Sequence, residues 1–185
     1  MEAPQPGHFW KIPFLWEQGC ATPSPSIRLS FAGVHLTSLE AAVADVMASS
    51  TDESDQAAVA ELGATGAARE LLGVDESYFQ WEPSWWRLAK DGSGETVGFV
   101  LPVRLRQEQH WQDGMPQGSI YYMGVLPAHR GNGYARELLD EATRMLLQHG
   151  CWRIFCDLSA TNEPMLKAFR QAGFNERNPW QRRIR

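Results

Sequence analysis

One stretch in the second half of the chain constrains the fold more than any other: a strand, a glycine turn and a long helix follow one another directly. An apolar segment over 119–126 predicts a buried strand. The turn after it contains Gly131 and Gly133. The following residues predict a helix that Gly150 ends, because one stripe at helical spacing is apolar. That stripe consists of Ala135, Leu138, Leu139, Ala142, Met145, Leu146 and His149.

Further periodic segments indicate the same fold class. Alternation over 27–31 predicts a first strand, and helical spacing predicts a helix opened by a Thr37–Glu40 capping box and a second helix over about 56–72. The segments 86–89 and 96–104 flank a turn-rich insert and predict a hairpin. A strand over 151–158 precedes a short helix, which opens near Pro164 and closes at Gly173. The sequence therefore predicts one mixed α/β domain.

The first 25 residues form a separate region, an arm rich in proline and aromatic residues. It holds five of the eleven prolines, but large apolar side chains such as Phe9, Trp10 and Trp16 interrupt them. Exposed side chains of this size forgo favourable burial, so we expect an irregular arm that packs on residues 26–185 or on a partner chain. The alternative is a tail that does not pack on the rest of the chain. A packed arm is compatible with a monomer and with a homodimer.

Composition and charge exclude several classes of protein. The 185 residues carry 17 basic and 22 acidic side chains, a net charge of −5, which argues against a nucleic-acid partner. No apolar run is long enough to span a bilayer, and the N-terminal residues lack the apolar core of a signal peptide. The three cysteines are too scattered for a disulfide framework or a zinc site. We expect a cytoplasmic protein with no membrane association and no metal.

The turn between the predicted strand and helix has the features of an anion-binding loop. Gly131 and Gly133 lack the Cβ atoms that would keep backbone N–H groups from converging, and Arg130 adds a positive charge. A helix N-terminus with such amides binds phosphate or pyrophosphate. The dinucleotide fingerprint is excluded because Arg136 stands where its third glycine belongs, and the Gly-Lys-Ser/Thr of a P-loop is absent.

The sequence Arg130-Gly131-Asn132-Gly133-Tyr134-Ala135 resembles the Arg/Gln-x-x-Gly-x-Gly/Ala loop of the GCN5-related N-acetyltransferases. The segment from Asn162 to Gly173-Phe174 resembles a second motif of that family, in which an Asn opens a helix that ends in Gly-Phe. This resemblance implies a mostly antiparallel sheet of about six to seven strands flanked by about four helices. It also implies an acceptor-side half over 26–104 and an acetyl-CoA-binding half over 118–185.

The resemblance assigns roles to named residues. Arg130, Gly131, Asn132, Gly133, Tyr134 and Ala135 would hold the pyrophosphate of acetyl-CoA, the co-substrate. The backbone of Met123, Gly124 and Val125 would pair with the pantetheine arm, Asn162 would bond the same arm, and Phe169 would lie near the thioester sulfur. The family implies acetyl transfer to an amine of an unidentified acceptor, a small molecule or a peptide, by direct transfer in a ternary complex.

The catalytic groups are less clear than the cofactor site. A backbone N–H of the Gly124–Val125 region is the expected donor to the oxyanion. Many family members have Tyr where this chain has Phe169, which cannot donate a proton to the leaving thiolate. Tyr121, Tyr122 or a water molecule could replace it, and strand alternation predicts that only one of the two tyrosines faces the cleft. Three loop residues could act as the base or could simply be solvated: Glu108, His110 and Asp113.

The acceptor side offers acidic and aromatic residues, and three functions stay open. Asp52, Glu53 and Asp55 lie between the two early helices, and Asp75 and Glu76 lie just before the aromatic residues. Acidic side chains beside Trp81, Trp85 and Trp86 could hold a cationic amine, but a solvated turn and an aromatic core explain these residues better. The functions are an acetyl-CoA-dependent N-acetyltransferase, a non-catalytic acyl-CoA-binding or sensing module of the same fold, and a structural protein that keeps the fold alone. We rank them in that order.

Overall fold

The computed structural model describes residues 2–106 and 114–184, and within them nine strands form one sheet. The order along the sheet is β2-β4-β5-β6-β7-β1-β8, with β3 paired to β5 and β9 paired to β1. All pairs are antiparallel except β6 and β7, which run parallel. The strands are β1 His8–Glu17, β2 Ser30–Gly33, β3 Phe79–Gln80, β4 Arg87–Lys90, β5 Thr96–Leu105, β6 Gln117–Val125, β7 Arg153–Ser159, β8 Asn175–Glu176 and β9 Trp180–Arg183.

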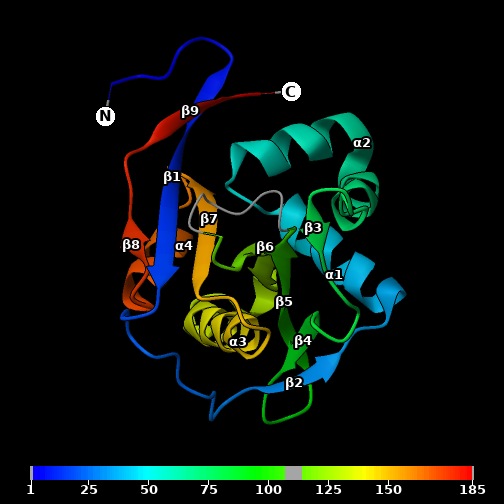
Figure 1. Cartoon of the computed structure of the whole chain (residues 1–185). Coiled ribbons are helices and arrows are strands. Elements are labelled where there is room, and N and C mark those ends of the chain that lie inside the picture. The colour runs from blue at the N-terminus through cyan, green and yellow to red at the C-terminus, as the bar shows by residue number, and fades with distance from the viewer. Residues whose placement is uncertain (1, 107–113, 185) are drawn as a thin grey trace.

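Four helices cover the two faces of this sheet (Figure 1). Helices α3 (Tyr134–Gln148) and α4 (Glu163–Gln171) share one buried apolar cluster with β1, β6 and β7. Helices α1 (Leu36–Ala48) and α2 (Glu53–Leu72) pack in a second cluster on the other face, over β4 and β5. The predicted mixed α/β class, with a mostly antiparallel sheet and four helices, is confirmed. Across the described residues, none of these helices is long and apolar enough to cross a membrane.

The sheet has more strands than the expected six to seven because both ends of the chain join it. The prediction of an irregular N-terminal arm is wrong for its central part, since β1 pairs with β7 from Lys11↔Ser159 to Glu17↔Arg153. Strands β8 and β9 lie along the opposite edge of β1. Phe14 is fully buried between these elements. Prolines are rare in inner strands, and this made the arm look irregular in sequence.

Two helix starts differ from the sequence prediction. Helix α1 begins at Leu36 with His35 at its N-cap and no side-chain cap, so the Thr37–Glu40 capping box is wrong. Glu40 instead accepts a hydrogen bond from Arg69 Nε of α2 at 2.9 Å. Helix α2 begins at Glu53, where the Asp52 carboxylate accepts from Ser54 N at 2.8 Å, and it contains a non-helical residue at Gly63. A capping side chain thus opens α2 rather than α1.

The helices of the second half follow the prediction closely. Helix α3 ends at Gln148 and buries Leu138, Leu139, Ala142, Met145 and Leu146 of the expected stripe. At the two ends of that stripe, Ala135 is half-buried and His149, the C-cap residue, is exposed. Helix α4 carries the Asn162 side chain as its N-cap and closes at Gly173, whose φ is 81°. Phe174 N donates to Phe169 O at 3.1 Å, which is the hydrogen bond of a Schellman motif. These two helices position the loops described next.

Candidate functional site

Strand β6 has one paired edge and one open edge. It pairs with β5 from Gly118↔Arg104 to Val125↔Gly98, but its pairing with β7 stops at Gly118↔Ile154. Leu126 N donates to Val97 O of β5 at 2.9 Å. Because the N–H groups of successive strand residues point to opposite edges, those of Met123 and Val125 face away from β5. Within the described residues, the part of β6 beyond Gly118 therefore offers backbone groups to an added strand.

A bulge in β6 changes where its two tyrosines point. Leu101 of β5 is paired with Tyr122 and the next residue, Pro102, is paired with Ile120, so Tyr121 is the extra residue. A bulge breaks strand alternation. Tyr121 and Tyr122 both pack against the α1–α2 cluster, while Ile120 and Met123 belong to the α3–α4 cluster. The prediction that the tyrosines face opposite sides is therefore wrong.

Both tyrosine hydroxyls are already hydrogen-bonded. Tyr121 Oη donates to Leu71 O at 3.1 Å, and Tyr122 Oη donates to Asp55 Oδ2 at 2.7 Å. Burial raises the pKa of Tyr121, and burial followed by the Asp55 charge raises the pKa of Tyr122 well above its ordinary value. Both phenols stay protonated at neutral pH. A catalytic role for either one stays a prediction.

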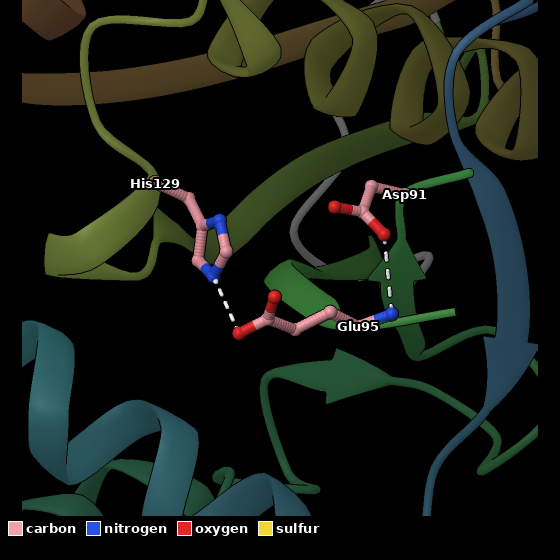
Figure 2. A group of neighbouring side chains, drawn as sticks. All are labelled: Asp91, Glu95 and His129. Carbon is pink, nitrogen blue, oxygen red and sulfur yellow. Dashed lines mark hydrogen bonds and ion pairs between the residues drawn. The ribbon is translucent and has the colours of Figure 1, made fainter. Parts of the chain in front are cut away.

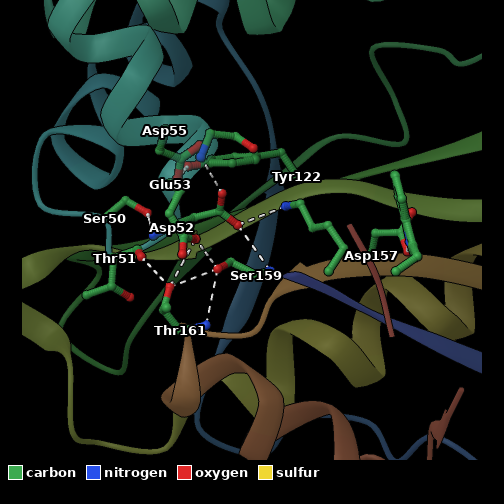
Figure 3. Close-up of polar contacts among 12 residues, drawn as sticks. Ser50, Thr51, Asp52, Glu53, Asp55, Tyr122, Asp157, Ser159 and Thr161 are labelled. Carbon is green, nitrogen blue, oxygen red and sulfur yellow. Dashed lines mark hydrogen bonds and ion pairs between the residues drawn. The ribbon is translucent and has the colours of Figure 1, made fainter. Parts of the chain in front are cut away.

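Asp55 belongs to a partly buried group of polar residues between α2 and β7, which we call the polar cluster (Figure 3). Its members are Lys11, Asp52, Glu53, Asp55, Tyr122, Ser159 and Thr161. Lys11 Nζ lies 3.1 Å from Asp52 Oδ2, and Ser159 Oγ donates to Glu53. Burial raises the pKa of Asp55 above that of an exposed carboxyl group. With three carboxylates and one ammonium, the cluster carries an excess of negative charge.

The glycine loop, Arg130–Ala135, lies at the end of β6 and leads into α3. A short 3₁₀ turn, Pro127–His129, connects it to the strand. Gly131 and Gly133 have φ values of 85° and 79°, a left-handed region that favours glycine. The residues 131–133 are exposed, and no backbone N–H from 131 to 135 has a partner within the described parts of the chain. The loop therefore presents free amides at the positive end of a helix.

Hydrogen bonds of its own side chains and of Arg28 hold this loop in place. Arg130 reaches the end of α1, with Nη1 3.0 Å from Ser49 O and Nη2 2.9 Å from Ser49 Oγ. Asn132 Nδ2 donates to His129 O at 3.0 Å. Arg28, which the sequence analysis did not consider, donates from Nη1 to Asn132 O at 2.9 Å. No short-range pattern marks Arg28, because its contact spans 104 residues of sequence.

His129 also contacts the β4–β5 hairpin, through Glu95 (Figure 2). The His129 Nε2 and Glu95 Oε1 atoms are 3.3 Å apart, and Asp91 lies close to both. These three residues have the ligand types of a divalent-metal site. The ion pair and the hydrogen bonds from Ser93 and Glu95 to Asp91 already account for their arrangement. We infer that these three residues hold the β4–β5 hairpin against the turn Pro127–His129, which precedes the glycine loop.

The segment from Asn162 to Phe174, which resembles the second family motif, has some exposed residues and some that belong to the buried core. Asn162 Oδ1 accepts from Met165 N at 3.4 Å, and the side chain is half-buried. Phe169 is 1% exposed, with its ring 5.3 Å from that of Phe14 and 4.9 Å from that of Phe174. Its packing role is thus visible, and its expected place near the thioester sulfur stays a prediction.

Several other candidates have a structural role or lie outside the described residues. Trp85 and Trp86 are buried core residues, and Trp81 stacks on Trp86 at 3.9 Å, so these rings do not form an open cage for a cation. Glu108, His110 and Asp113 fall in 107–113, outside the described residues. Burial raises the pKa of Cys151 to about 11 and that of Cys156 to about 12, which fits thiols that stay protonated.

Known proteins share this arrangement to different extents. The family model described as "Acetyltransferase (GNAT) family" matches residues 53–174. A mycothiol acetyltransferase of Propionibacterium freudenreichii subsp. shermanii is 30% identical over 120 residues. That alignment covers 62% of this chain and 35% of the relative, so the chain spans about a third of the length of the curated relative it matches.

Two solved structures have a similar fold at low sequence identity. The aminoglycoside N-acetyltransferase AAC(6′)-Iy in complex with CoA has a TM-score of 0.53 at 19% identity, over 84% of this chain and 93% of that one. The NatC complex bound to Gag peptide and CoA gives 0.56 at 17% identity, over 82% and 87%. The family match spans well over half of the 185 residues. The chain therefore belongs to the GNAT family of acetyltransferases.

Proposed function

We propose that this chain is an acetyl-CoA-dependent N-acetyltransferase that moves an acetyl group directly to an amine within a ternary complex. The observation that carries the proposal is the glycine loop, whose amides have no partner among the described residues. The loop lies at the end of a strand whose outer edge is also unpaired in that part of the chain. Two structures with this fold are complexes with CoA, which supports the choice of co-substrate. A cytoplasmic location and a homodimer stay expectations.

The residues present fit acetyl-CoA. The amides from Gly131 to Ala135 would bind the pyrophosphate, because they lie at the N-terminus of α3 and have no partner within the described residues. The backbone of Met123 and Val125 would pair with the amide groups of pantetheine as an added strand does. Asn162, at the N-cap of α4, would bond the same arm from the α4 side.

When bound, acetyl-CoA supplies a thioester whose carbon–sulfur bond breaks as the amine nitrogen bonds to the acetyl carbon, while the amine loses one proton and the sulfur gains one. The Val125 N–H, fixed on a strand edge, would stabilise the negative charge that develops on the acetyl oxygen. Tyr122 and Asp55 would accept the proton in a relay: Tyr122 Oη takes it up and passes its own hydrogen to Asp55 across 2.7 Å.

The acceptor would lie beside the polar cluster, which continues from this relay toward β7. Its excess of carboxylates favours an acceptor that carries a positive charge beside the reacting amine, which attacks in its neutral form. The curated relative is named for mycothiol, one structural neighbour for aminoglycosides, and another is bound to a peptide. We propose a small-molecule or peptide amine as the acceptor class.

One observation favours a second function, an acyl-CoA-binding or sensing module without turnover. Phe169 has no hydroxyl group, and the hydroxyls of Tyr121 and Tyr122 already donate to acceptors within the protein. None of these three side chains therefore offers a free acid to protonate the leaving thiolate. A thiol with an ordinary pKa near about 8.5 is a tolerable leaving group without one, and so the enzyme ranks first.

Calorimetric titration with acetyl-CoA, followed by thiol release with a panel of amines, tests both functions. An enzyme binds acetyl-CoA and releases free thiol with at least one class of amine, and the product gains the mass of an acetyl group. Saturable binding with no thiol release across polyamine, aminoglycoside, amino-thiol and peptide amines would favour the sensing module. Absence of binding would contradict both.

A further inference from the structure

Arg28 lies against the glycine loop, although it precedes the segment that the family model matches. Its Nη1 donates to Asn132 O at 2.9 Å, and its guanidinium carbon lies 5.0 Å from the centre of the Tyr134 ring. Its Nη2 is 3.7 Å from the point that a Cβ on Gly133 would occupy. The family match begins only at residue 53. Arg28 therefore brings a positive charge to the glycines from outside the recognised motif.

The arginine inside the motif has a different position. Both terminal nitrogens of Arg130 bond to Ser49 at the end of α1, and its Nε lies 3.3 Å from Val125 O. This guanidinium fixes α1 to the loop, on the side that leads back to β6. Arg28 is the arginine whose guanidinium lies against Gly133 and Tyr134 at the start of α3. Arg130 therefore lies on the side of the loop toward β6, and Arg28 lies on the side toward α3.

The surroundings of Arg28 leave it able to bind an additional anion. It forms an ion pair with Glu137, whose carboxylate also accepts from Ser26 Oγ. A guanidinium has five N–H donors, and two of those of Arg28 are engaged, so three have no partner within residues 2–106 and 114–184. Half of the side chain is exposed. Without Arg28, the Glu137 carboxylate would place an unbalanced negative charge beside a phosphate site.

We infer that Arg28 is a phosphate-binding residue of the CoA site, and that it binds the nucleotide phosphates together with the free amides of the glycine loop. This inference rests on the proposed function, since it names a further ligand of that same site. Arginine suits the role because its planar group can hold the loop carbonyl, stack on Tyr134 and still direct donors to a phosphate.

Calorimetric titration of Arg28→Gln with acetyl-CoA and with acetyl-pantetheine, which lacks the phosphates, tests the inference. A lost charge-assisted hydrogen bond should weaken acetyl-CoA binding by about tenfold or more. Binding of acetyl-pantetheine should not change. The matched control is Arg69→Gln, which removes another exposed arginine paired to a glutamate, and it should bind both ligands as the unaltered chain does.

The double variant Arg28→Gln/Glu137→Gln separates phosphate binding from simple neutralisation of Glu137. If Arg28 binds phosphate, the double variant stays about tenfold weaker than Glu137→Gln alone. Equal acetyl-CoA affinity of those two variants would overturn the inference, and so would an equal loss of acetyl-CoA and acetyl-pantetheine binding in Arg28→Gln. If the unaltered chain does not bind acetyl-CoA, both the proposed function and this inference are overturned. If it binds and removal of Arg28 leaves the acetyl-CoA affinity unchanged, only this inference is overturned.

Discussion

The glycine loop and the polar cluster are both rich in hydrogen-bonding groups, but they differ in whether those groups have partners within the described protein. The loop leaves the amides of residues 131–135 without a partner in the described structure and holds its shape through side chains such as Arg28 and Arg130. In the polar cluster, Tyr122 is paired with Asp55 and Lys11 with Asp52. A site with free donors is ready for a ligand, whereas a paired site must exchange partners to bind one.

The largest effect is expected at the free amides. Gly133→Val should weaken acetyl-CoA binding by about a hundredfold or more, because a side chain there covers the amides and two charge-assisted hydrogen bonds are lost. Gly150→Val is a matched control, since both glycines have φ of 79° and a Cβ would meet no close atom at either, the nearest to Gly133 being 3.7 Å away. Both variants bear the same backbone strain, and calorimetry should show a loss of binding only for Gly133→Val. Equal affinities of the two would contradict the role of the loop.

A smaller effect is expected in the polar cluster. Tyr122→Phe removes the donor to Asp55 and should lower kcat by about tenfold to a hundredfold, in the range of general acid–base catalysis, with little change in acetyl-CoA affinity. Tyr121→Phe is the control on the adjacent residue, because its hydroxyl donates to the Leu71 carbonyl and not to a carboxylate. Steady-state kinetics of both variants decide the question. Similar kcat values would remove Tyr122 from the proposed relay.

Helix α1 joins the two regions, and a variant of β6 tests that link. A Cβ on Gly124 would lie 2.6 Å from Val46 Cγ1, so Gly124→Ala must displace α1 and should lower the free energy of unfolding by about 1–3 kcal/mol. Val46→Ala in the same chain removes the obstructing methyl groups. Chemical denaturation should therefore show the double variant to be more stable than the sum of the single effects. Additive effects would contradict this contact.

The smallest effect concerns pH. Burial raises the pKa of Asp55 in the folded chain above its unfolded value, so the stability linked to its protonation is full at low pH and is lost as the pH rises through the folded pKa. Asp55→Asn has no charged form and should be more stable than the unaltered chain near neutral pH, with the advantage disappearing below the unfolded pKa.

Asp75→Asn provides a control of opposite sign for this pH dependence. The hydrogen bonds from Ser77 lower the pKa of Asp75, so its charged form contributes stability at neutral pH that is lost as the pH falls through the lowered folded pKa. Thermal unfolding across a pH series should show Asp75→Asn to be less stable near neutral pH. A pH-independent difference for both variants would contradict these assignments.

The sequence predicts the cofactor half better than the rest because its signals are local. The stripe of α3, the cap at Asn162 and the closing Gly173 each lie within a few residues of the element that they define. Strand β1 depends on partners about 140 residues away, and the proline-rich sequence around it predicts an irregular arm. The common face of Tyr121 and Tyr122 depends on a bulge that appears only when β6 is paired with β5.

The candidate site divides in the same way. The glycine loop could be predicted residue by residue, since its glycines and Arg130 are consecutive. Arg28 and the Asp55–Tyr122 pair could not, because their partners are brought together only by the tertiary fold. The acidic residues near α2 were noted in the sequence, but their pairing with Lys11 and Ser159 requires β1 and β7 beside them.

The central claim is that the free amides of the glycine loop bind the phosphates of CoA. Amide chemical shifts recorded by NMR during titration with acetyl-CoA test it directly. We expect saturable shifts at Gly131, Asn132, Gly133, Tyr134 and Ala135 that inorganic pyrophosphate reproduces in part. Saturable binding that leaves these five amides unmoved while others shift would contradict it.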